Sequence, residues 1–273
     1  TNDMTLGVEG IREYRVVTNS FSAEYGMTMG SQIVMVTKSG TNELHGSLFE
    51  YLRNSALDAR NWTDIPIKAP LKQNNFGVAL GGPVRHDKFF YFGTYEGLRL
   101  RRSLSPTKAQ TQVPTLAARN GDINGDGISE VTVDPAVKPY LQFWPAPNAV
   151  DPTLAPSGIG IYNYTYNPQS REDYAQMRND YNISSSDTLF GRYTISNGGS
   201  NGTDPMLRPD LEGNNYSSRN QWLTLSDNHI FSPTLLATFR GSFSRTRSMS
   251  TYHLNTPPEL SFVPGQPMGQ LGI

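Results

Sequence analysis

Hydrophobic and polar residues alternate along several segments in the second half of the chain. In residues 174–184, one set of alternate positions is apolar, interrupted only by Asn179, and comprises Ala175, Met177, Tyr181 and Ile183. The intervening positions are polar and comprise Gln176, Arg178, Asp180 and Asn182. A period of two places the two sets on opposite faces of a β-strand. The pattern therefore predicts an amphipathic strand with charged residues well inside it.

The same alternation recurs in residues 188–196 and 235–245. Leu189, Tyr193 and Ile195 alternate with Arg192, Thr194 and Ser196. Further along, Phe239, Gly241 and Phe243 alternate with Arg240, Ser242 and Ser244. Weaker patterns complete a set of seven predicted strands, at about 45–54, 74–84, 88–101, 172–184, 188–197, 219–231 and 235–246. Most of these runs reach about ten residues, the length of a tilted membrane strand, whereas strands of soluble proteins are typically nearer five or six.

Short and long connections take turns between the predicted strands. The short ones lie near residues 85–88, 184–187 and 232–234, and the long ones span about 54–73, 103–170, 197–218 and 247–273. Outer-membrane barrels have short turns at one end and long loops at the other, whereas a compact soluble domain seldom holds several such long loops. Aromatic residues such as Phe89, Phe90, Tyr91 and Phe231 near strand ends fit the girdles of such barrels. We therefore expect a mainly β chain, with residues 45–273 forming part of an antiparallel transmembrane β-barrel.

Residues 1–44 follow a different pattern. They contain a short strand-like segment at 8–17, a glycine-punctuated stretch at 23–30 and a compact apolar strand at 32–37. A polar turn at 38–42 closes the region. We expect these residues to form the C-terminal part of a small α/β domain.

Composition narrows the function classes. The 23 Lys and Arg residues balance 24 Asp and Glu, so the clustered excess of positive charge needed to bind nucleic acid is missing. The absence of Cys excludes disulfides and Cys-ligated zinc. No run approaches the roughly 20 apolar residues of a membrane-spanning helix, and Thr1 begins in polar sequence without a signal peptide. Because the sequence opens and closes abruptly, we expect both ends to lie inside a longer protein.

Three motifs follow one another in the first part of the chain: EGIREY at 9–14, TNSFSAEYG at 18–26 and IVMVTKSGTNELH at 33–45. In this order they resemble the end of the plug domain in the Oar-like group of TonB-dependent receptors, which carry an upstream carboxypeptidase-regulatory-like domain. GSLFEY at 46–51, RN at 53–54 and LDARN at 57–61 resemble the first barrel strand and its loop. KQNNFGVALGGP at 72–83 and KFFYFGTYEGLR at 88–99 resemble the next two strands, and PTLAARNGD at 114–122 with PAPN at 145–148 resembles the long second outer loop.

The resemblance covers nearly all of residues 8–246 and carries functional implications. It implies that residues 1–44 end a plug and that residues 45–273 begin a barrel of about 22 strands. It implies a bacterial outer-membrane receptor that moves an unidentified extracellular substrate, energised by the TonB complex through a preceding N-terminal part, and embedded in outer-membrane lipid. Glu50 and Glu96 are expected to face the barrel interior or the plug. The polar positions would line the lumen: Gln176, Arg178, Asp180, Asn182, Arg192, Thr194, Arg240 and Ser242.

A separate motif at residues 122–130 (DINGDGISE) suggests calcium. Oxygen-bearing side chains at alternate positions with Gly127 at the sixth fit a Ca²⁺ loop. The expected ligands are the side chains of Asp122, Asn124, Asp126 and Glu130 with the Ile128 carbonyl. The twelfth position is Val133, where an EF-hand needs a bidentate Glu, so an EF-hand is not expected. The alternative is an Asx- and Gly-rich turn that binds nothing.

Catalysis finds little support, and no cofactor other than Ca²⁺ is expected. The four His residues lack paired metal-ligand spacing, and Gly81-Gly82-Pro83 lacks the ending of a phosphate loop. Two other hypotheses stay open beside the transporter. One is a secreted or surface calcium-binding adhesion module built on the Asp122 loop, and the other is an extracellular enzyme acting on polysaccharide.

Overall fold

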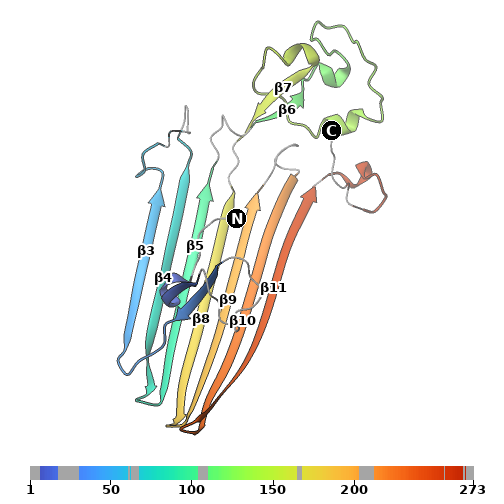
Figure 1. Ribbon diagram of the computed structural model, residues 1–273. Helices are drawn as coiled ribbons and strands as arrows, with labels where there is room; N and C mark the ends of the chain where they lie inside the picture. The colour runs from blue at the N-terminus through green and yellow to red at the C-terminus, as the bar shows by residue number, and fades with distance from the viewer. Residues whose placement is uncertain are drawn as a thin grey trace.

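The computed structural model describes residues 7–17, 31–60, 62, 68–103, 110–164, 168–202, 212–254, 256–266 and 268. Its main feature is a seven-stranded antiparallel sheet in the order β11-β10-β9-β8-β5-β4-β3 (Figure 1). The strands are β3 His45–Asn54, β4 Leu71–Arg85, β5 Phe89–Arg102, β8 Gln169–Ser184, β9 Asp187–Gly202, β10 Glu212–Ser232 and β11 Leu235–Leu254. The predicted class, mainly β with about seven antiparallel strands, is confirmed.

Most of the strands extend further than the alternation predicts. β10 has 21 residues and β11 has 20, and β9 runs to Gly202 rather than ending near 197. The predicted loop at 197–218 is correspondingly shorter, because both its flanks are strand. The added lengths, such as residues 197–202, carry Gly, Ser and Asn on both faces. A stretch without apolar residues shows no alternation, so the sequence pattern ends before the strand does.

The connections divide between the two ends of the sheet (Figure 1). Two- or three-residue turns join β4 to β5, β8 to β9 and β10 to β11 at one end, which we call the turn end. The strand ends between β3 and β4, between β5 and β8 and between β9 and β10 all lie at the other, which we call the loop end. The alternation of short and long connections is thus an asymmetry between two ends in space.

Strand pairing assigns every residue of the sheet to one of two faces, because directly opposed residues of antiparallel strands point the same way. One continuous row across β4, β5, β8, β9, β10 and β11 is Ala79, Thr94, Gln176, Thr194, Trp222 and Ser244. We call the face with this row the polar face. The next row, on the opposite face, is Leu80, Gly93, Met177, Tyr193, Leu223 and Phe243. We call this second face the outward face.

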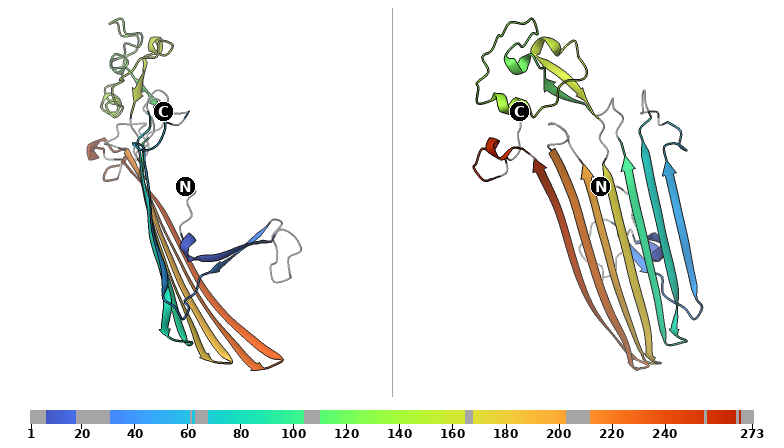
Figure 2. Two further views of the ribbon diagram at one scale, coloured as in Figure 1. Left: turned by 90° about the vertical axis from the view of Figure 1, so that its left-hand side faces the viewer. Right: turned by 180° about the vertical axis from the view of Figure 1, so that it is seen from behind.

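The N-terminal segment lies against the polar face. It comprises the 3-10 turn η1 Val8–Gly10 and the antiparallel hairpin of β1 Ile11–Val17 with β2 Gln32–Thr37. Figure 2 shows this hairpin projecting from the concave side of the curved sheet. The connection to β3 passes so close to the turn end that a Cβ on Gly40 would lie 2.3 Å from the Tyr91 carbonyl oxygen. Only glycine allows this approach.

The long connection between β5 and β8 is not an open loop. Within it, β6 Gln110–Pro114 pairs with β7 Ile159–Asn163, and the short helix α1 Lys138–Leu141 lies between them in sequence with the 3-10 turns η2 Ala118–Asn120 and η3 Ala155–Ser157. A small core forms around Val113, Phe143 and Trp144, and Met268 from the C-terminal segment completes it. Tyr140 stacks on Phe262 with ring centroids 5.4 Å apart. The β5–β8 connection and the segment after β11 therefore pack on each other at the loop end, and we call them together the outer module (Figure 1).

None of the helices among the described residues is long and apolar enough to cross a membrane.

Candidate functional site

All eight polar positions predicted from the alternation lie on the polar face. Gln176 is opposite Thr194, and Arg178 is opposite Arg192. On β10, Thr224 lies opposite both Arg192 of β9 and Ser242 of β11. In the same way, Ser226 lies opposite both Phe190 of β9 and Arg240 of β11. Asp180 and Asn182 continue the same face of β8 towards the turn end. The pairing of four strands thus places on one surface residues that the sequence offers only as separate alternations.

Glu96 on β5 holds the start of the N-terminal segment. Its side chain is 2% exposed, and its two carboxylate oxygens accept hydrogen bonds from the backbone N–H groups of Gly7 (2.8 Å) and Glu9 (3.0 Å). Gly7 has φ +92°, and a Cβ there would lie 2.6 Å from the Tyr174 ring. A buried carboxylate that accepts one backbone N–H on each of its oxygens makes a strong attachment. Glu96, which was expected to face the barrel interior or the plug, thus faces the N-terminal segment on the polar face.

Arg178 on β8 makes the second attachment. Its guanidinium pairs with both carboxylate oxygens of Asp180, at 2.8 and 2.7 Å. The remaining nitrogen donates to the side-chain oxygen (2.9 Å) and the carbonyl oxygen (3.2 Å) of Thr37 at the end of β2. The guanidinium also lies 4.5 Å from the centroid of the Phe190 ring. Because Asp180 and Phe190 fix its orientation, Arg178 presents a preorganised donor to the N-terminal segment.

A third contact ties the segment to β3. The Glu9 carboxylate accepts a hydrogen bond from the Ser47 hydroxyl at 2.9 Å and forms an ion pair with Lys38 at 3.5 Å. The attachments of the N-terminal segment to the sheet are thus polar and spread over β3, β5 and β8.

Some buried polar atoms beneath the segment have no hydrogen-bond partner among the described residues. They include the Thr94 hydroxyl and the Gln176 side-chain nitrogen, both next to Gly10. Buried donors and acceptors in native proteins are usually paired, often with ordered water. The contact between segment and sheet is therefore not packed as an apolar core would be.

Two predicted residues lie differently from expectation. Asn182 is on the polar face, but its side chain donates to the Asp87 carbonyl oxygen (3.0 Å) in the turn between β4 and β5. Glu50 lies on the outward face, in line with Leu48 and opposite Phe76, so the expectation that it faces the interior is wrong. Aromatic or apolar residues flank Glu50 on both sides in sequence, and such a run does not reveal which face is which.

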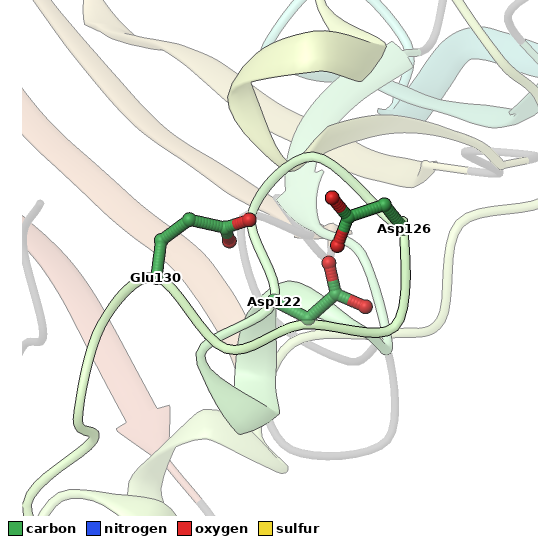
Figure 3. A group of neighbouring side chains, drawn as sticks. All are labelled: Asp122, Asp126 and Glu130. Atoms are coloured by element: carbon green, nitrogen blue, oxygen red, sulfur yellow. The ribbon is translucent and has the colours of Figure 1, made fainter.

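The calcium motif forms a closed loop in the outer module (Figure 3). One carboxylate oxygen each of Asp122, Asp126 and Glu130 lie within 4.8 Å of one another. Backbone N–H groups of the loop already bond to these carboxylates: Gly125 and Gly127 donate to Asp122 (2.7 and 2.9 Å), and Ile123 donates to Glu130 (2.6 Å). The Asn124 side-chain oxygen accepts the Asp126 N–H at 2.9 Å. Three of the predicted side-chain ligands therefore lie close together, and the fourth, Asn124, donates to the Asp126 carboxylate at 3.2 Å.

Arg119, next to this loop, secures the outer module from inside. It donates to the carbonyl oxygens of Pro145 (2.6 Å) and Pro114 (3.3 Å), and its burial lowers the pKa of the guanidinium below its ordinary value. Both prolines belong to the two motifs that marked a long outer loop in the sequence. The sequence pattern did not predict that Arg119 joins these two motifs, because hydrogen bonds between distant segments leave no local pattern.

Comparisons with known proteins agree with this architecture. A family model described as outer membrane beta barrel domain matches residues 36–272. The TonB-dependent transporter Oar of Myxococcus xanthus is 29% identical over 111 residues, which cover 34% of this chain and 10% of that relative. The aligned part thus spans about a tenth of the length of the curated relative. No solved structure matches the chain significantly. With its antiparallel sheet of membrane-length strands and a family match over most of its length, the chain belongs to the outer membrane β-barrel domain family, whose members reside in the outer membrane.

Proposed function

We propose that the chain is part of a TonB-dependent outer-membrane transporter of the Oar-like group. In this proposal residues 1–44 are the end of a plug domain, and the polar face is the wall of a lumen that a hydrated substrate crosses. The observation that carries the proposal is the attachment of residues 7–17 and 31–38 to the polar face through Glu96 and Arg178. The relative named as a TonB-dependent transporter supports the same function.

The chemistry of the contact suits a plug that has to move. The segment is held to the sheet by hydrogen bonds to Glu96, Arg178 and Ser47, and among the described residues some buried polar atoms beside them have no hydrogen-bond partner. A polar contact of this kind exchanges protein partners for water at modest net cost, unlike a dry apolar core. Energy delivered by the TonB complex would release the segment from Glu96 and Arg178 and leave a lumen lined by polar side chains.

No chemistry on the substrate is part of this proposal. The lumen residues would act by hydration and hydrogen bonding: Gln176, Arg178, Asp180, Asn182, Arg192, Thr194, Arg240 and Ser242. The expected partners are outer-membrane lipid, the TonB complex and an unidentified extracellular substrate, and nucleic acid is not among them.

The test is ion conductance in planar bilayers together with cross-linking to TonB in cells. The full-length protein should conduct little, and a version lacking the whole plug domain up to residue 40 should open a large, stable conductance. Site-specific cross-linking of the full-length protein to TonB should give a covalent adduct. Equal conductance with and without the segment would overturn the plug assignment, and failure to cross-link would leave a passive channel.

We propose calcium binding as a second property, located in the outer module. The three converging carboxylates of Asp122, Asp126 and Glu130 fit a hard cation that prefers oxygen ligands. Carbonyl groups and water would supply the rest of its shell. Because the loop is exposed and its carboxylates already have backbone partners, we expect a dissociation constant of about 10⁻⁴–10⁻³ M, the range of extracellular modules.

The Asp126→Asn substitution should weaken calcium binding about tenfold or more, because it removes one of three charges from the site. Calorimetric titration of the full-length protein with CaCl₂ measures the effect. Asp134→Asn is the matched control, because Asp134 lies in the same module and its side chain caps the Ala136 N–H instead. Absence of calcium binding by the unaltered protein at millimolar concentration would leave the loop as an Asx- and Gly-rich turn.

A further inference from the structure

Basic residues gather on the outward face near the loop end of the sheet. Strand pairing sets Lys72 of β4 opposite Arg101 of β5, and Arg99 of β5 opposite Arg171 of β8. Lys72 occupies the same set of alternate positions on β4 as Val78 and Leu80, which are on the outward face. Its neighbours Arg99, Arg101 and Arg171 belong to the matching sets on β5 and β8, so all four side chains point outward. Together with Asn74 and Gln169, they line a cavity of about 740 Å³.

These positions are electrostatically unbalanced. Like charges set directly opposite each other destabilise a sheet, and here two such pairs occupy neighbouring rows. Asp173 pairs with Arg99 at 2.6 Å. Among the residues that the structure describes, no ion pair includes Lys72, Arg101 or Arg171. Asp173 is also close enough to Arg171 for an electrostatic interaction. Four cations thus share one carboxylate among the described residues of these rows, and an anion between the rows would relieve the repulsion that remains.

The floor of the cavity is open because glycine lies beside arginine. Arg171 is paired with Gly199 on β9, and a Cβ on Gly199 would come within 3.8 Å of the Arg171 side chain. The missing side chain of Gly199 leaves the Arg171 guanidinium accessible from the side, where its planar set of donors matches a phosphate group.

The position of the cavity relative to the apolar surface selects the ligand. Below it on the same face are exposed apolar side chains, among them Val78, Leu80, Met177, Leu223 and Phe243. Arg99 and Arg101 lie four and six residues beyond Tyr95 on β5, which corresponds to roughly 10–15 Å along the barrel axis for a strand tilted by about 40°. In an outer-membrane barrel the apolar band faces lipid tails, so the basic rows lie at the level of the headgroups.

We propose that this cavity with its four basic residues, which we call the basic groove, binds the phosphate groups of an anionic glycolipid headgroup in the outer leaflet of the outer membrane. The long connections at this end identify it as the outer end, since outer-membrane barrels carry their long loops outside. The groove lies on the face opposite the lumen wall. Its ligand is therefore a component of the surrounding membrane, distinct from a transported substrate, and the inference does not depend on transport.

The experiment titrates the full-length protein, purified in a neutral detergent, with bis-phosphorylated lipid A and with lipid A from which both phosphates have been removed. Native mass spectrometry counts the bound lipid. We expect the phosphorylated lipid to bind at least tenfold more tightly. The double variant Arg101→Gln/Arg171→Gln should abolish that difference. The double variant Arg85→Gln/Lys88→Gln, which removes two charges at the turn end, should retain it.

Other outcomes would overturn the proposal. Equal binding of the two lipids by the unaltered protein would show that the phosphates are not recognised, and this arm needs no variant to fold. Equal losses in both double variants would show a diffuse charge effect. Full competition by millimolar inorganic phosphate would show a site for free anions instead of lipid. Heat-dependent gel mobility verifies that each variant is folded, and Arg101→Lys/Arg171→Lys, which keeps both charges, should retain most of the binding.

Discussion

Replacing Glu96 with glutamine is expected to release the start of the N-terminal segment from the sheet. The carboxylate is buried and accepts two backbone hydrogen bonds, from Gly7 and Glu9. An amide has one acceptor oxygen and places two N–H donors where the second acceptor stood, so at least one backbone donor loses its partner. Hydrogen bonds to charged groups contribute about 1.5–3 kcal/mol each. We expect the attachment to weaken by roughly 2–3 kcal/mol, which is about 30- to 150-fold in its equilibrium constant.

Amide hydrogen exchange of the purified full-length protein measures this effect. Peptides that contain residues 7–10 should exchange faster in the Glu96→Gln variant, while β4 and β5 keep their protection. Glu50→Gln is the matched control, since it makes the same chemical change two strands away on the outward face. Unchanged exchange at residues 7–10, or an equal acceleration by both variants, would contradict the role assigned to Glu96.

Placing arginine at position 243 should prevent much of the protein from folding into the membrane. Phe243 lies on the outward face opposite Leu223, in the apolar row that includes Met177 and Tyr193. A charged side chain that faces lipid near the midplane costs about 2–4 kcal/mol. Ser242, the preceding residue, lies on the polar face opposite Thr224. Ser242→Arg should therefore cost far less, although it differs from Phe243→Arg by only one position.

The measurement is urea-dependent folding of the full-length protein into lipid vesicles, followed by the heat-dependent shift in gel mobility. The midpoint should fall markedly for Phe243→Arg and stay close to the unaltered protein for Ser242→Arg. The reverse order, or equal midpoints, would mean that the two faces have been assigned the wrong way round. This pair of variants therefore tests the face assignment on which both the lumen and the lipid groove depend.

The two glutamates show where sequence reasoning reaches its limit. Both Glu50 and Glu96 belong to aromatic-rich stretches, and both were expected to face the interior or the plug. Pairing places Glu96 in line with Thr94 on the polar face, whereas Glu50 lies in line with Leu48 on the outward face. Where aromatic residues occur on both faces of a strand, alternation gives two sets without telling which is which. The strand's neighbours decide the face.

The outer module illustrates a second limit. Residues 103–170 read as one long loop because their apolar residues follow no period. In the structure, Val113, Phe143 and Trp144 form a small core that needs Met268, more than a hundred residues further on. Contacts between segments so distant in sequence leave no local pattern. The convergence of Asp122, Asp126 and Glu130 was predictable because it arises within nine residues.

The sequence by itself determined the number and order of the seven main strands, the mainly β class and the alternation of short turns with long connections. It could do so because a period of two and the turn residues between strands are local properties of the chain. Only the tertiary structure decided how far the strands extend, that the N-terminal segment is attached through Glu96 and Arg178, and that four basic residues meet at the loop end. Each of these depends on which residue lies opposite which across strands that are distant in sequence, and pairing is fixed by the assembled sheet.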